Sequence, residues 1–122
     1  MLRPGRLSQE LGPRLAALVT GGVAVTTDVV VTELLRGARD LADYQRLEAQ
    51  LAALPLLPVT AERWREAARL GFDLLRQHGL IVATPDLLIA AVAIAHRATI
   101  VHRDADFDLI AQHTPLHVES HI

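Results

Sequence analysis

The chain has 122 residues, a formal net charge of −2 and no cysteine. Hydrophobic residues make up 51% of the sequence and charged residues 21%, which predicts one globular domain and excludes a disordered chain. The lack of cysteine excludes disulfides, thiolate metal sites and cysteine nucleophiles and is compatible with a cytoplasmic location, and no apolar run reaches the roughly 18 residues of a transmembrane helix.

Apolar spacing along the first two thirds of the chain predicts helices that alternate with short strands. A helix is predicted over residues 7–19 and a short buried strand over 23–26. Thr27 or Asp28 is positioned to cap the next helix. Further along, the pattern predicts helices over 29–37, 41–54 and 60–75 and a strand over 56–59. Thr60 is expected to cap the last of these helices and Gly79 to close it.

The segment Thr84-Pro85-Asp86 is the clearest helix start in the sequence. Thr84 is expected as the N-cap, Pro85 at the first helical position and Asp86 in the first turn. The helix predicted over 85–97 is apolar almost throughout, so it should be buried on several sides. A strand over 99–102, a helix over 105–111 and a strand over 116–119 complete the pattern, which predicts a parallel α/β architecture.

Three groups of acidic residues lie where loops enter or leave these elements. They are Glu33, Asp86, and Asp104 together with Asp106. Each is flanked by residues that should be buried, so each is expected at the rim of one core. Carboxylates that converge repel one another unless a cation holds them. Because hard oxygen ligands favour Mg²⁺ or Mn²⁺, the pattern points towards a metal-dependent nuclease.

Each acid also has an ordinary structural explanation. Glu33 fits a solvated helix position, and Asp86 in a first helical turn gains about 0.3–1 kcal/mol from the helix dipole. Asp104, Asp106 and Asp108 alternate after a strand and fit a solvated turn that opens the next helix. Asp104 is nearest the strand's C-terminal end, where open α/β sheets place their sites, so it ranks first. Asp106 ranks second, and Asp108 is expected at the surface.

Three segments carry a resemblance to a known family: VTELLRGA at 31–38, TPDLLIAA at 84–91 and IVHRDADF at 100–107. In this order and at these separations they resemble the PIN-domain ribonuclease toxins of the VapC type. The resemblance implies a three-layer PIN-like α/β fold, with a short parallel sheet flanked by helices, in a single domain over 1–122. It also implies an Mg²⁺- or Mn²⁺-dependent endoribonuclease in which Glu33, Asp86 and Asp104 are catalytic and, with Asp106, bind the metal.

The resemblance further implies partners. RNA is the implied substrate, the implied binding partner is a small VapB-like antitoxin, and a homodimer is the family expectation. Every one of the 12 residues counted as Lys or Arg is arginine. Arg36, Arg39 and Arg103 follow or flank the acids and are candidates to contact RNA phosphate, with ordinary surface charge as the alternative. Trp64, the only tryptophan, is expected in the core or in helix packing.

The start of the chain departs from the family pattern. Members of that family begin with a strand that ends in an aspartate, whereas no aspartate precedes Asp28 here. We therefore expect the first strand to be missing, through a shortened or mis-called N-terminus. The site would then lack one anionic ligand, which predicts weaker metal binding and little or no activity. The alternative function is a catalytically impaired relic that binds an antitoxin or dimer partner without cleaving RNA.

Overall fold

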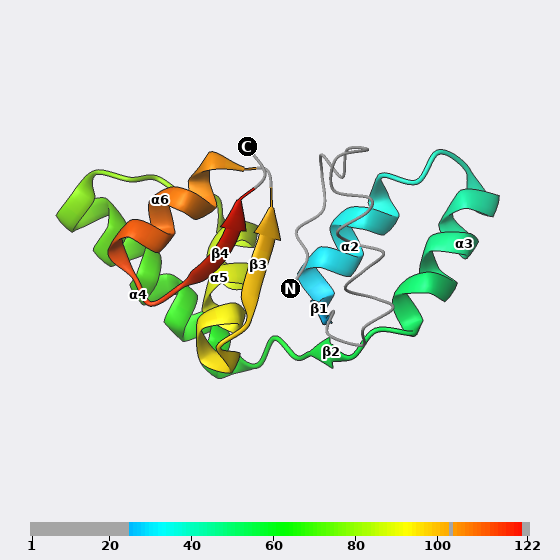
Figure 1. The fold of residues 1–122 in the computed structure, drawn as a ribbon, viewed down its shortest axis with the longest axis horizontal. Helices are drawn as coiled ribbons and strands as arrows, with labels where there is room; N and C mark the ends of the chain where they lie inside the picture. The colour runs from blue at the N-terminus through cyan, green and yellow to red at the C-terminus, as the bar shows by residue number, and fades with distance from the viewer. Residues whose placement is uncertain (1–24, 103, 121–122) are drawn as a thin grey trace.

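The computed structural model describes residues 25–102 and 104–120. Helices and short parallel strands alternate along the chain, as predicted (Figure 1). In chain order the elements are β1 (Thr26–Thr27), α2 (Asp28–Arg36), α3 (Leu41–Ala52), β2 (Leu56–Leu57), α4 (Ala61–His78), α5 (Thr84–His96), β3 (Thr99–His102), α6 (Ala105–His113) and β4 (His117–Ser120). The helix and strand residues predicted before residue 25 lie outside the described part of the chain.

The described strands form two parallel pairs. β1 pairs with β2, and β3 pairs with β4, and no hydrogen bond between described strands joins the two pairs into one sheet. Each pair is connected through helices, as parallel strands require: α2 and α3 link the first pair, and α6 links the second. In the second pair His102 is the register partner of Ser120, so the C-terminal ends of β3 and β4 lie side by side.

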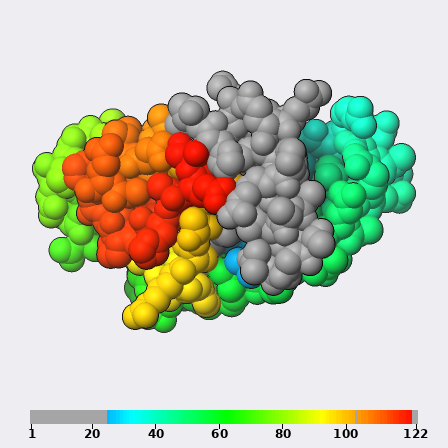
Figure 2. Space-filling model, in the orientation of Figure 1, coloured from blue at the N-terminus to red at the C-terminus, as the bar shows by residue number. Residues whose placement is uncertain are grey.

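Helix α5 forms the centre of the core. Its residues from Asp86 to Ala93 are all buried, as its continuous apolar sequence predicted. Helix α4 packs along α5, and α2, α6 and β3 also contact α5 (Figure 1). In the space-filling view α6 and β4, in orange and red, lie on one side of the molecule, and α3, in teal and green, lies on the other (Figure 2). Helix α5, which carries Asp86, therefore contacts both α6, which follows Asp104, and α2, which carries Glu33.

The start of α5 differs from the prediction by one residue. Ala83, not Thr84, is the N-cap, because its carbonyl oxygen already accepts hydrogen bonds from the backbone N–H groups of Asp86 and Leu87. Thr84 and Pro85 are therefore the first two residues of the helix. Asp86 remains in the first turn, as predicted. Proline is tolerated there because the first N–H groups of a helix have no intrahelical partner.

The other predicted helix caps are confirmed. Thr27 caps α2 by accepting a hydrogen bond from Val29 N–H at 3.0 Å, and Thr60 caps α4 by accepting one from Arg63 N–H at 3.4 Å. Gly79 closes α4 with a left-handed φ of 67°, a conformation that glycine adopts at little cost. These caps fix the lengths of α2 and α4 and therefore the positions of the loops that follow them.

The prediction that Trp64 lies in the core is wrong. Trp64 is 53% exposed and lies on the outer face of α4, where Phe72 and Leu75 are 56% and 48% exposed. The spacing of these three residues places them along one helix face. Other positions of α4 supply the buried Ala67 and Leu74 to the core. Helix α4 therefore has an inner apolar face and a second, solvent-facing apolar stripe.

Candidate metal centre

The turn after β3 fixes the positions of two of the predicted site residues. Asp104 is the N-cap of α6, and its Oδ1 accepts a hydrogen bond from the backbone N–H of Asp106 at 2.9 Å. Both carboxylates are half-buried, while Phe107 at the next position is fully buried in the core. A carboxylate has about four acceptor positions, so one N–H leaves Asp104 free to bind further groups. Phe107 therefore anchors in the core a turn that carries the two half-buried acids Asp104 and Asp106.

Asp86 approaches this turn from the first turn of α5. It is only 5% exposed although it lies in the most apolar helix of the chain. Burying a carboxylate is costly unless it is hydrogen-bonded, paired with a charge or bound to a metal. The positive end of the α5 dipole favours a carboxylate in this turn. Both the helix end and a cation would therefore stabilise Asp86 in its ionised form.

The structure brings three of the four predicted metal ligands together. One carboxylate oxygen from each of Asp86, Asp104 and Asp106 lies within 4.8 Å of the others. Ligand oxygens about 2.1 Å from an octahedral Mg²⁺ lie roughly 3.0 to 4.2 Å apart, so three oxygens that all lie within 4.8 Å of one another are close enough to share one cation. An all-carboxylate set suits hard divalent cations and does not suit soft ones. The predicted convergence is confirmed for these three aspartates.

Glu33, the fourth predicted ligand, lies on a different helix. It lies in α2, is half-buried and has one buried carboxylate oxygen. Helix α2 packs against α5, which carries Asp86. Among the described residues, however, Glu33 does not belong to the group whose ligand oxygens all lie within 4.8 Å. Glu33 is therefore set apart from the three aspartates by position, although its helix α2 contacts the helix α5 that carries Asp86.

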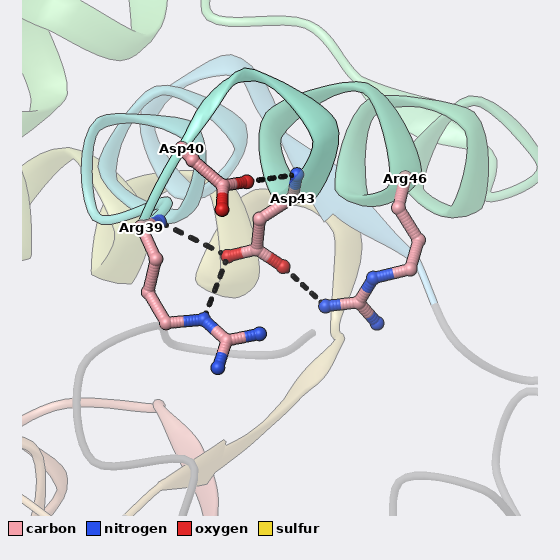
Figure 3. A network of polar contacts seen from close by, with 4 residues as sticks. All are labelled: Arg39, Asp40, Asp43 and Arg46. Atoms are coloured by element: carbon pink, nitrogen blue, oxygen red, sulfur yellow. Dashed lines mark hydrogen bonds and ion pairs between the residues drawn. The ribbon is translucent and has the colours of Figure 1, made fainter.

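Arg39, one of the predicted RNA contacts, is tied to the start of α3. Its backbone N–H donates to Oδ2 of Asp43 at 3.1 Å, and its Nε lies 3.6 Å from the same oxygen. Arg46 pairs with the other carboxylate oxygen of Asp43, and Asp40 caps the helix by accepting from Asp43 N–H (Figure 3). The Arg39 side chain is still 83% exposed, which leaves most of its guanidinium accessible to a ligand.

This network changes the acidity of Asp43. The pKa of its carboxyl is held below the ordinary value of 3.8, first because the Arg39 backbone N–H donates to it and second because the Arg46 guanidinium does. Arg36, another predicted RNA contact, is the exposed last residue of α2. Arg103, the third, lies outside the described residues.

Sequence reasoning missed three residues beside the metal ligands. His102 is fully buried, and its Nδ1 accepts a hydrogen bond from the backbone N–H of Asp104 at 2.9 Å. Asp108, expected at the surface, is only one-third exposed and contacts both His102 and Ser120. The available signal was a histidine that ends an apolar strand directly before an acidic turn. Its meaning depends on the pairing of β3 with β4, which local spacing does not reveal.

Comparison with known proteins gives the family. The PIN-domain family model matches residues 6–112. VapC ribonuclease Mb1587 of Mycobacterium bovis is 42% identical over 92 residues, which cover 75% of this chain and 69% of that protein. Ribonuclease VapC51 of Mycobacterium tuberculosis is 39% identical over 98 residues, which cover 77% of this chain and 69% of that protein.

Solved structures agree with this result. VapBC-5 of Mycobacterium tuberculosis matches with a TM-score of 0.57 and 30% identity, over 79% of each chain. VapBC2 of Rickettsia felis, bound to a DNA fragment from its promoter, shares the fold with a TM-score of 0.72 and 24% identity, over 95% of this chain and 88% of that chain. No described helix is long and apolar enough to cross a membrane. The chain is therefore a PIN-domain protein of the VapC ribonuclease family.

Proposed function

We propose that this chain is a metal-dependent endoribonuclease, the toxin of a toxin-antitoxin system, and that it hydrolyses phosphodiester bonds of RNA. The observation that carries the proposal is the meeting of Asp86, Asp104 and Asp106 within 4.8 Å. Asp86 lies in the first turn of α5, Asp104 is the N-cap of α6, and Asp106 lies in the first turn of α6. Their mutual repulsion is relieved when they share a cation.

Asp86, Asp104 and Asp106 would hold Mg²⁺ or Mn²⁺. When bound, such a cation polarises a phosphodiester, lowers the pKa of a coordinated water and stabilises charge on the leaving oxygen. The three aspartates contribute negative charge. Two of them are also held in place, because Asp104 is the N-cap of α6 and Asp86 lies in the buried helix α5. This donor set contains no nitrogen or sulfur, which disfavours zinc relative to magnesium or manganese.

Glu33 is assigned a catalytic role next to this group. We assign it the removal of a proton from the attacking water, because a carboxylate that is not fully used as a metal ligand can act as general base. Its half-buried position on α2, which packs on α5, is consistent with a group directed at the same site. If Glu33 is the general base, its mutation should reduce the rate of RNA cleavage more than it reduces the affinity for the cation.

Arginines supply the contacts to RNA in this proposal. Arg36 and Arg39 follow Glu33 at the end of α2 and before α3, and their side chains are exposed. Guanidinium groups bind phosphate oxygens in a bidentate manner, which suits an RNA backbone better than ammonium groups do. Arg103 is included from the sequence, because it directly precedes Asp104. We place the activity in the cytoplasm, where RNA is made and translated.

The proposed protein partner is a VapB-like antitoxin. The related VapBC-5 structure is of a member of the VapBC family of toxin-antitoxin systems, and the related Rickettsia felis structure is of VapBC2. In this chain the apolar stripe of Trp64, Phe72 and Leu75 on α4 offers a surface for an amphipathic helix, and a groove that these three residues do not line lies between α4 and α5. The groove is lined by Arg63, Glu66, Arg69, Leu70, Ala91, Ile94 and Ala95. A homodimer, also proposed, would compete for or extend the same apolar surface.

A cleavage assay tests the proposal. The purified chain is incubated with a mixed RNA pool in Mn²⁺, in Mg²⁺ and in excess EDTA, together with the Asp86→Asn variant. Asp73→Asn on α4 is the matched control, since it removes one acid that pairs with Arg69 at 3.0 Å on an exposed helix face. The sequence predicts little activity, so we expect cleavage that is slow, requires a divalent cation, is lost in Asp86→Asn and is kept in Asp73→Asn.

Two other outcomes are informative. Cleavage that persists in EDTA or in Asp86→Asn would overturn the proposed metal centre. Absence of cleavage in every metal, with tight antitoxin binding, would favour the binding protein that the sequence offered as its alternative. The weaker metal binding expected from the sequence stays a prediction, and the cation concentration at half-maximal cleavage measures it.

A further inference from the structure

His102 occupies a position that links the strand pair to the acidic turn. It is the last residue of β3, it is 0% exposed, and its ring packs at 5.3 Å from the ring of Phe107 with a tilt of 57°. Its Nδ1 accepts a hydrogen bond of 2.9 Å from the backbone N–H of Asp104. A fully buried imidazole thus holds the main chain of a proposed metal ligand.

The hydrogen bond at Nδ1 determines which ring nitrogen carries the proton. Nδ1 must present its lone pair to the Asp104 N–H, so the proton of the neutral ring is on Nε2. Nε2 lies 3.2 Å from Oδ1 of Asp108, in a direction outside hydrogen-bond geometry, so the attraction there is electrostatic. The carboxylate of Asp108 thereby favours the tautomer that can accept from Asp104.

Asp108 is held in turn by the second strand. Its Oδ2 accepts a hydrogen bond from Ser120 Oγ at 2.9 Å. Ser120 is the register partner of His102 at the end of β4, so one carboxylate bridges side chains on two neighbouring strands. A continuous series of contacts therefore runs from Ser120 through Asp108 and His102 to the main chain of Asp104.

We propose that His102 is a positioning residue for the metal centre, oriented by Asp108 and Ser120. The inference rests on the proposed function, because it takes Asp104 as a cation ligand. Since Asp104 Oδ1 accepts from Asp106 N–H, a turn fixed by His102 fixes two carboxylates at once. Groups that orient metal ligands in this way typically change metal affinity by about 10–100-fold when they are removed. His102 itself does not contact substrate or cation in this proposal.

The experiment measures Mn²⁺ affinity directly, by the electron paramagnetic resonance signal of free Mn²⁺ in titrations of the full chain. His102→Leu removes both ring nitrogens, whereas His102→Asn keeps an oxygen acceptor near the place of Nδ1. We expect His102→Leu to weaken Mn²⁺ binding about 10–100-fold and His102→Asn to retain most of the affinity. Circular dichroism confirms that each variant is folded before titration.

A second pair of variants keeps the test decisive where His102→Leu does not fold. Asp108→Ala removes the carboxylate that favours the Nε2–H tautomer, and Asp73→Ala is the control for loss of one acid on the exposed face of α4. Nitrogen-15 NMR of the imidazole reports the tautomer. We expect a protonated Nε2 and an unprotonated Nδ1 in the wild type and in Asp73→Ala. Asp108→Ala should show mixed tautomers together with weaker Mn²⁺ binding.

The outcomes separate this inference from the proposed function. If the wild type binds Mn²⁺ no better than Asp104→Asn does, the metal centre itself is wrong. If Asp104→Asn abolishes binding while His102→Leu and Asp108→Ala bind as tightly as the wild type, the positioning role is wrong. A wild-type spectrum with the proton on Nδ1 also contradicts it, because that tautomer cannot accept from Asp104.

Discussion

Asp86 and Asp104 open two different helices, yet they bring carboxylate oxygens within 4.8 Å of each other. Asp86 is in the first turn of α5 and Asp104 is the N-cap of α6. The two positive helix ends favour negative charge at the same place. Helix ends supply partial charges only, so they offset part of the repulsion between the carboxylates and leave room for a cation to offset the rest.

The separate position of Glu33 leads to the first prediction. Glu33→Gln should reduce RNA cleavage by about 10²–10⁴-fold, the usual effect of removing a general base. Mn²⁺ affinity should change only a few-fold, because Glu33 lies outside the group of three mutually close carboxylates. Cleavage rates at saturating Mn²⁺ and a parallel binding titration distinguish the two effects. A loss of Mn²⁺ binding as large as that in Asp86→Asn would make Glu33 a principal ligand instead.

Trp64 gives a built-in probe of the proposed partner surface. It is the only tryptophan and is 53% exposed, so the free chain should emit at the long wavelengths typical of a solvated indole. Binding of a peptide from the cognate antitoxin should shift this emission to shorter wavelengths as the ring is buried. Phe72→Ala on the same stripe should weaken that binding, whereas Asp73→Ala should not. An emission spectrum unchanged at saturating peptide would place the antitoxin elsewhere.

Asp43 makes the stability of α3 depend on pH. Its pKa is lowered in the folded chain, so its contribution is complete above the ordinary value of 3.8 and is lost as the pH falls through the lowered folded value. Asp43→Asn should therefore lower the melting temperature at pH 7 and have a smaller effect near pH 3. Glu48→Gln, an exposed acid on the same helix, is the control. Equal destabilisation by Asp43→Asn at both pH values would contradict this reasoning.

Phe107 anchors the acidic turn to the core. Its side chain is fully buried and packs against His102, while Asp106 and Asp108 on either side are half-buried. Phe107→Ala should cost about 3–5 kcal/mol of unfolding free energy through lost burial and a cavity. Phe107→Leu should cost much less, because it refills most of the volume. Urea unfolding followed by circular dichroism measures both, and similar costs for the two variants would argue against a packed anchor.

Local patterns in the sequence predicted much of this fold. The caps at Thr27 and Thr60 and the left-handed Gly79 follow from short-range chemistry, and the structure confirms them. The buried helix α5 and the alternation of helices with parallel strands also follow from spacing and composition. The convergence of Asp86, Asp104 and Asp106 was expected from their places at the ends of buried elements, and it is confirmed.

The errors concern features that depend on long-range packing. Trp64 was expected in the core or in helix packing, but α4 buries Ala67 and Leu74 and leaves the indole exposed. Asp108 was expected at the surface, and its contacts with His102 and Ser120 were not predicted. They depend on the pairing of β4 with β3, which local spacing does not show. Thr84 is not the N-cap, because the Ala83 carbonyl oxygen accepts the first helical hydrogen bonds and the helix begins one residue earlier than predicted. The metal identity and the RNA contacts of Arg36, Arg39 and Arg103 stay predictions.

The most direct measurement is the thermal stability of the wild type and of Asp104→Asn with increasing Mn²⁺. A cation that binds the folded chain at 100 times its dissociation constant stabilises it by about 2.7 kcal/mol. We predict a melting temperature that rises with Mn²⁺ in the wild type and does not rise in Asp104→Asn. Equal rises in the two proteins, or no rise in either, would contradict a cation site built from these three aspartates.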